Sequence, residues 1–271
     1  MAPPSGKDMK RPREAWWLSS LGAAALAYVA LAYLLLPAFW RHYEHQPNLA
    51  LKPMVTRNSA GIAGDPLNVG LVGNLNEITR AMTGAGWTRA DPLSIKSDVE
   101  IAESVALDRS YKDAPVSNLF YQGRREDIAF EMQIGSSAAH RHHVRFWKVL
   151  ERGAEDRNVW LGSATLDRDI GFSRYTGQIT HHIASDIDAE RQFMIGKLTS
   201  AGVVSTIYTV SGIGPTLNGR NGEGDWYYTD GEIEIAVISL GASSPTVTTI
   251  LDAPTSVAVK NKIWNSFRSF K

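Results

Sequence analysis

Two short stretches of the chain hold most of the residue types that could do chemistry. The stretch HRHHVRFW begins at His140 and contains the doublet His142–His143, and the stretch TGQITHHI contains the doublet His181–His182. Imidazole serves proteins as a general acid or base, as a nucleophile and as a metal ligand. The doublets are therefore the first place to look for a site that binds a metal or a substrate.

An extended backbone would divide each doublet between two faces of a sheet. Side chains alternate along a strand, so Arg141, His143 and Arg145 share one face while His142 lies on the other. The second doublet divides in the same way. We therefore expect one histidine of each doublet in a shared site, and we favour the face that carries the two arginines.

Guanidinium groups suggest the first chemical interpretation. Arginine binds phosphate and carboxylate groups through paired N–H donors, so this face is predicted to bind an anionic ligand. A charged sheet face that is paired with nearby acids is the structural alternative. The residues predicted to bind the ligand are Arg124, Arg125, Arg141, His143 and Arg145.

A metal ion or a catalytic histidine is the second interpretation. The chain has no cysteine, so a metal would need histidine and carboxylate ligands, which suit a divalent ion such as zinc or manganese. The candidate metal ligands are His142, His143, His181, His182 and Asp186. The candidate catalytic residues, for hydrolysis of a phosphate or related ester, are His143, His182, Asp167 and Asp169. Purely structural histidines remain the alternative, because the fixed spacing of a motif such as HExxH is absent.

Composition and motifs argue against several other function classes. The 28 basic and 28 acidic residues balance, so the chain as a whole has no electrostatic case for binding nucleic acid. The glycines near residue 70 do not form the GxGxxG pattern of a dinucleotide site. No GxxxxGK[ST] phosphate loop occurs, and Ser163 and Ser173 lie outside any GxSxG motif.

The segment from Ala15 to Trp40 has no charged side chain and carries tryptophan near both ends. As a helix it would be about 39 Å long, enough to cross a hydrocarbon core of about 30 Å. More basic residues precede it than follow it closely, which predicts a cytoplasmic N-terminus and an extracytoplasmic remainder at the inner membrane. A cleaved signal peptide is the alternative, although its apolar region would be shorter.

Four parts follow from this reading: a cytoplasmic tail (1–14), a transmembrane anchor (15–40), a linker (41–64) and a globular domain (65–271). In the domain, residues 127–134, 142–150 and 158–166 predict an antiparallel meander, and residues 185–202 predict a helix. Asp230–Gly231 predicts a hairpin turn within residues 226–240. Together these elements indicate an α+β (or α/β) fold with a mixed β-sheet.

Three blocks of the globular region resemble a known family. They are DPLNVGLVG from Asp65, APVSNLFYQGRREDIAFEMQIGSSAAHRHHVRFW from Ala114 and VWLGSATLDRDIGFSRYTGQITHHIASDIDAER from Val159. Over residues 65–202 the chain resembles the LssY C-terminal domain family of bacterial proteins. Some members carry this domain behind membrane segments related to lipid phosphatases or DedA-like proteins, so the resemblance implies an envelope or lipid-linked setting. The family has no established activity to carry over, and this chain has one anchor and no phosphatase segment.

The leading prediction is a single-pass membrane-anchored domain that binds an anionic, phosphate- or lipid-related ligand or an envelope partner. The alternatives are a metal-dependent or histidine-based hydrolase and a structural adaptor in a membrane complex. The lipid bilayer, reached through residues 15–40, is the expected partner, and nucleic acid is not. A divalent metal is the one cofactor that the histidines suggest.

Overall fold

The structure is a computed structural model, and it divides the chain into two compact units. These are Met1–Tyr43 and Glu44–Lys271, each described here by itself. The residues that the structure describes are 13–35, 38, 45–49, 52–90, 119–135, 140–177, 179–210, 218–240, 247–253, 255, 258–259, 262–263 and 266.

The first unit contains one long apolar helix. It begins as α1 (Arg13–Val29) and continues as the π-helical segment η1 (Ala30–Leu35). Residues Trp16–Leu35 are long and apolar enough to cross a membrane, a property that a signal sequence near the N-terminus shares. The predicted N-terminal apolar helix is confirmed. Of its expected last residues, 36–40, all but Ala38 lie outside the described part.

The described part of the second unit combines α-helices with many strands, which confirms the predicted α+β class with a mixed sheet. The helices are α3 (Leu75–Gly84) and α5 (Ile187–Ser200), and η2 (Pro47–Leu49) is a short 3-10 turn. The strands are β1 (Val55–Asn58), β2 (Ala63–Pro66), β3 (Val69–Val72), β4 (Thr88–Arg89), β5 (Leu119–Tyr121), β6 (Arg124–Arg125), β7 (Ile128–Gln133), β8 (Arg141–Leu150), β9 (Val159–Phe172), β10 (Ile179–Ile183), β11 (Val204–Val210), β12 (Asn218–Arg220), β13 (Trp226–Tyr228), β14 (Ile233–Ile238) and β15 (Thr249–Ile250).

The large sheet has the order β15-β11-β14-β3-β9-β8-β7-β4 among the described residues, and β10 also pairs with β9. The predicted meander is present, because β7, β8 and β9 pair in sequence and antiparallel. The sheet is mixed because β14 runs parallel to β3 and β15 runs parallel to β11. A smaller sheet has the order β2-β1-β5-β6.

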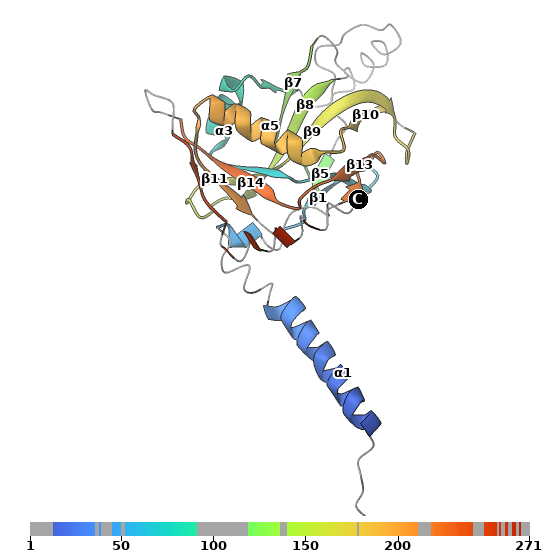
Figure 1. Cartoon of the computed structure of the whole chain (residues 1–271). Coiled ribbons are helices and arrows are strands. Elements are labelled where there is room, and N and C mark those ends of the chain that lie inside the picture. Colours follow the sequence, from blue (N-terminus) through green and yellow to red (C-terminus); the bar gives the residue numbers. More distant parts are fainter. Residues whose placement is uncertain are drawn as a thin grey trace, which may run out of the picture. The chain divides into compact units, whose positions relative to one another are not determined.

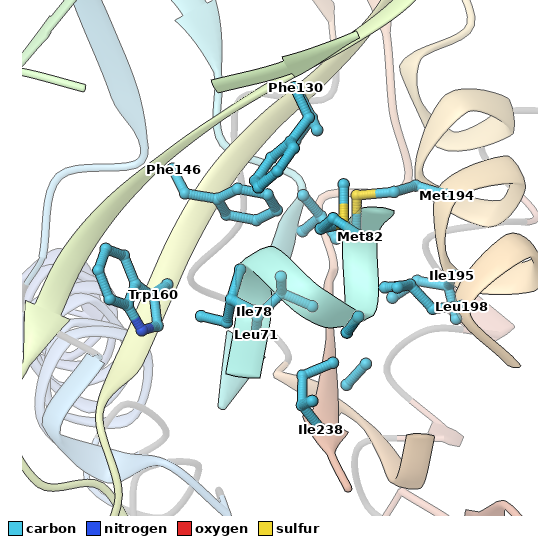
Figure 2. Packing of buried hydrophobic residues seen from close by; sticks show 14 of the residues in the cluster. Leu71, Ile78, Met82, Phe130, Phe146, Trp160, Met194, Ile195, Leu198 and Ile238 are labelled. Atoms are coloured by element: carbon cyan, nitrogen blue, oxygen red, sulfur yellow. The ribbon is translucent and has the colours of Figure 1, made fainter. Parts of the chain in front are cut away.

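Helices α3 and α5 cover one face of the large sheet (Figure 1). Figure 2 shows Ile78 and Met82 of α3 and Met194 of α5 packed with Phe130 and Phe146 of the strands. Each helix begins at a capping side chain that accepts a hydrogen bond from a backbone N–H three residues on, Asn74 for α3 and Asp186 for α5. These caps end the preceding strands and turn the apolar helix faces onto the sheet.

The opposite face of the large sheet carries a second apolar cluster. Trp147 of β8 and Leu161 of β9 pack there with Leu119 and Tyr121 of β5, which belong to the small sheet. The large sheet is therefore covered by helices on one side and in part by the small sheet on the other. The candidate site lies on this second side, where the apolar cluster ends.

Strand β9 is the central strand of the domain, because three other strands pair along its length. β8 pairs with one edge, while β3 pairs with Val159–Gly162 and β10 pairs with Asp167–Phe172 along the other edge. Asn68 bridges the gap between β3 and β10. Its amide donates to the carbonyl of Ala164 (3.0 Å) and accepts from the N–H of Ala164 (2.9 Å), in place of a neighbouring strand.

Two local expectations differ from the structure. The expected hairpin at Asp230–Gly231 is wrong: β13 pairs with β12, whereas β14 lies between β11 and β3. The apolar strand β14 is buried in the centre of the large sheet, whereas the aromatic strand β13 has its first and last residues exposed.

The segment expected to be a linker, 41–64, contains η2, β1 and the start of β2. Leu49 is fully buried, and the amide of Gln46 donates to Tyr208 (2.7 Å) and to Glu155 (2.6 Å). The polar composition of segment 41–64 suggested a tether, but Gln46 of this segment makes its hydrogen bonds inside the domain.

Candidate functional site

A ladder of polar side chains crosses β8 and β9 on the face of the second apolar cluster. Arg141 lies opposite Asp167, His143 opposite Thr165 and Arg145 opposite Ser163. All six are buried, with exposed fractions of 1–4%. The next pair along the strands, Trp147 and Leu161, is apolar. The predicted alternation along β8 therefore holds, and its arginine face is an interior polar cluster.

Arg141 is matched by two carboxylates. Its Nη1 donates to Glu131 (2.8 Å) and its Nε donates to Asp167 (3.0 Å). The guanidinium is 1% exposed, and both acids are also buried. Such a buried arrangement is stable only when the charges are paired, so the primary role of Arg141 is to hold Asp167 and Glu131 in place.

A small cavity opens beside this ladder. His143 and Arg145 of β8, Asp167 of β9 and His181 of β10 line it. Further lining residues are Gly64, Asp65, Leu119, Thr180, Ile183, Asn221, Gly222 and Glu223. The centre of a water molecule has about 20 Å³ available to it, so the space suits one small polar group rather than a whole large ligand.

His143 is a buried lining residue with unused hydrogen-bonding capacity. It is 3% exposed, and its Nε2 has no hydrogen-bond partner among the residues that the structure describes. Its Nδ1 lies 3.9 Å from an Asp167 carboxylate oxygen. Burial, and then the charges of Arg145, Arg141 and His181, hold the pKa of His143 well below its usual value. The imidazole is therefore neutral at neutral pH.

His181 joins His143 from the neighbouring strand. Its Nε2 is 3.5 Å from Nη2 of Arg141. A guanidinium only donates, so this nitrogen is the acceptor and the ring proton belongs on Nδ1. Burial is the main cause that lowers the pKa of His181 to about 3, followed by the charges of Arg141 and Arg145 and then by that of His182.

Two carboxyl groups also line the cavity. Asp65 accepts a hydrogen bond from the Asn221 amide (3.0 Å) and lies 3.6 Å from Nη1 of Arg145. Burial raises the pKa of Asp65, and it raises the pKa of Asp167 as well, although Arg145 and Arg141 respectively oppose the effect. The cavity therefore combines donors and acceptors instead of presenting positive charge alone.

The other member of each doublet lies elsewhere, as strand alternation predicts. His142 is on the helix-covered face, where its Nδ1 contacts Glu190 (2.9 Å) and its ring stacks on Phe193 (3.7 Å between centroids). His182 contacts Asp225 through Nδ1 (2.8 Å). The structure thus brings His143 together with His181, whereas the catalytic candidates named from the sequence combined His143 with His182.

The remaining candidates are dispersed. Asp186 caps α5 through Ala189 N–H, and Asp169 is exposed on β9. Arg124 and Arg125 are exposed on β6 and do not line the cavity. Arg124 instead donates to Asp127 (3.0 Å) and to the carbonyl of Lys148 (2.9 Å).

Within the described part of the chain, no cluster of three or more histidine, aspartate or glutamate side chains is arranged to hold a metal ion. Of the five candidate metal ligands, His143 and His181 share the cavity, and the other three lie in separate environments. Sequence reasoning missed Asp65, Asn221 and Glu223 as neighbours of these histidines. Nothing in their local patterns marks them, because the folding of distant segments brings them to the cavity.

The LssY C-terminus family matches residues 44–233. The chain belongs to this family. The LssY region begins at the first residue of the second compact unit, so it includes β1 and β2 as well as every residue that lines the cavity. Comparison with curated proteins and with solved structures found no match.

Proposed function

We propose that this LssY-family protein is a single-pass membrane protein whose globular domain binds a small anionic group in the polar cavity. The group is of the phosphate or carboxylate type, and its contacts are Arg145, His143 and His181. The LssY domain and the apolar N-terminal helix support the membrane-anchored part of the proposal. The excess of basic residues before the helix supports a cytoplasmic N-terminus and an extracytoplasmic domain.

The unpartnered Nε2 of His143 is the observation that carries the ligand proposal. A polar atom buried without a partner loses hydrogen-bond energy that a ligand atom would restore. Arg145 supplies charge in the same cavity, and the proximity of two arginines opposes protonation of the neighbouring imidazoles. An anion would relieve that unfavourable field, because negative charge next to His143 favours its protonated form.

Binding is tested with the full chain in detergent and inorganic phosphate as the probe. We expect phosphate to raise the melting temperature in a saturable way, relative to chloride at equal ionic strength. His143→Gln should weaken the apparent affinity about tenfold or more, since a hydrogen bond to a charged ligand contributes about 1.5–3 kcal/mol. His140→Gln is the matched control, because His140 is exposed just before β8. Equal stabilisation by phosphate in both variants would contradict the proposed site.

A histidine-based hydrolase is a second candidate, favoured by one contact. The Nδ1 of His143 lies 3.9 Å from a carboxylate oxygen of Asp167, so a small approach of the two side chains would make His143 an oriented general base. The depressed pKa of His143 makes it a weak base in the free protein. Turnover of a chromogenic phosphate monoester that depends on His143 but not on His140 would favour this candidate over binding alone.

A further inference from the structure

The polar cavity is lined in part by hydrogen-bond acceptors. A pocket that bound every anion equally well would be lined by hydrogen-bond donors. Asp65 and Asp167 contribute carboxylates, and His143 contributes a nitrogen without a partner. A carboxylate accepts hydrogen bonds, and a neutral imidazole accepts at the nitrogen that lacks the proton. A ligand in this cavity therefore meets groups that accept as well as groups that donate.

Asp65 has an oxygen in position to accept from a ligand. One of its carboxylate oxygens takes the Asn221 amide at 3.0 Å. The other is 3.6 Å from Nη1 of Arg145, which is longer than a direct charge-assisted hydrogen bond of about 2.7–2.9 Å. A ligand hydroxyl that bridges this oxygen and Arg145 from the cavity side would accept from the guanidinium and donate to the carboxylate.

Oxyanions differ in their ability to donate. Sulfate at neutral pH carries no proton, so its oxygens only accept, and next to Asp65 it would face like charge in a poorly solvated space. Hydrogen phosphate and a singly charged phosphate monoester each keep a P–O–H group that donates. A site built around such a donated proton discriminates strongly against an analogue that lacks it.

We propose that the cavity selects oxyanions that carry a proton, such as hydrogen phosphate or a phosphate monoester, over sulfate. Arg145 donates a hydrogen bond to the ligand, and Asp65 accepts a hydrogen bond from the ligand hydroxyl. His143 lines the same cavity. This inference rests on the proposed anion-binding function and narrows the class of ligand. It commits the site to phosphoryl groups with a free hydroxyl and excludes phosphodiesters, which have none.

Selectivity is measured on the full chain in detergent by titration with inorganic phosphate and with sulfate at equal ionic strength. At about pH 7.5, phosphate should bind at least about tenfold more tightly than sulfate. Equal affinities would overturn the selectivity and leave the anion site standing. Binding of neither anion, in the absence of lipid phosphate, would contradict the site for free anions.

Asp65→Asn tests the acceptor directly. The amide keeps the shape of the side chain but replaces an oxygen acceptor with a donor, so phosphate should bind at least about tenfold more weakly and sulfate more tightly. Asp156→Asn makes the same chemical change at an exposed turn residue and should alter neither affinity. Glu223→Gln, at a less buried lining residue, is a second test if Asp65→Asn does not fold. Unchanged selectivity in a folded lining variant would refute the role of carboxylates in selection.

Free phosphate and the headgroup of a lipid monoester can both present a phosphoryl group with a hydroxyl. Separate binding experiments distinguish the two ligands. Micelles doped with phosphatidic acid, a monoester, are compared with micelles doped with phosphatidylglycerol, a diester of like charge. Stabilisation by phosphatidic acid without inorganic phosphate binding would indicate a lipid ligand with the proposed chemistry. Equal stabilisation by both lipids would overturn the requirement for a ligand proton.

Discussion

At the residue scale, the polar cluster shows how a folded domain holds charge in its interior. Arg141 is placed between Glu131 and Asp167 at distances of 2.8 and 3.0 Å, and the three side chains are buried together. Removal of Arg141 would leave two buried carboxylates without the cation that they share, which is strongly destabilising. His143 and His181 lie beside this pairing as neutral rings, because burial, and then the charges of both arginines, lower the pKa of each imidazole.

The neutral state of His181 predicts a measurable dependence of stability on pH. Its pKa is about 3 in the folded chain, below its ordinary value near 6.5, so the unfolded chain binds more protons between these values. The contribution is therefore fully present above about pH 6.5 and is lost as the pH falls towards about 3, at about 1.4 kcal/mol per pH unit.

His181→Gln should remove this contribution. Between about pH 7 and about pH 5, the loss of unfolding free energy should be smaller in the variant by about 2 kcal/mol. Urea unfolding of the full chain in detergent measures the difference, and His140→Gln serves as the exposed control. Identical pH profiles for wild type and His181→Gln would show that His181 titrates normally in the folded protein.

At the element scale, β9 determines where the site lies. Its first half pairs with β3 and β8 in the apolar part of the sheet, and its second half continues to Phe172 with β10 as a partner. The ladder of polar pairs occupies the stretch between the two partners on one edge. Asn68 closes that edge, and it also donates to the carbonyl of Ile187 at the start of α5 (2.8 Å).

Asn68→Ala should therefore destabilise the domain more than an ordinary surface change. The substitution leaves the N–H and carbonyl of Ala164 and the carbonyl of Ile187 without this partner, and each buried unsatisfied group costs about 1–3 kcal/mol. We expect a loss of about 3–5 kcal/mol in urea unfolding after partial relaxation. Asn158→Ala, which removes an exposed amide contact with Glu151, should cost less than about 1 kcal/mol. A similar cost for both variants would argue against the bridging role.

At the scale of the whole molecule, an apolar helix precedes an LssY domain that begins at residue 44. Only residues 36–43 separate the helix that the structure describes from this domain. In the proposed membrane-anchored protein, residues 36–43 would connect the anchor to the domain. The proposed orientation places the cavity in the extracytoplasmic compartment, where it would meet external phosphate or lipid headgroups.

The orientation is tested by cysteine labelling, which is straightforward because the chain has no cysteine. In intact cells, a membrane-impermeant maleimide should label Asp156→Cys, at an exposed turn, but should label Ser5→Cys only after permeabilisation. The reverse pattern would place the domain in the cytoplasm. Loss of the N-terminal segment from the mature protein, seen by intact mass, would instead identify the apolar helix as a signal sequence.

Local sequence patterns predict much of the architecture. The apolar segment, the helix after Asp186 and the meander of β7, β8 and β9 follow from side-chain periodicity and capping, which act within a few residues. The division of each histidine doublet between two faces is equally local, because the alternation of side chains is a property of any extended strand. The sequence alone therefore determined that His143 shares a face with Arg141 and Arg145.

Only the tertiary structure decided what meets that face. The register of β10 on β9, with an irregularity between His182 and Ile183, brings His181 to the cavity. Asp65 and Asn221 reach it from segments far apart in the chain. The predicted hairpin at Asp230–Gly231 was wrong for the same reason. Turn residues favour a reversal of the chain, but burial selects the strand partners. Pairing between distant segments depends on the energy of the whole packed sheet, which no local spacing encodes.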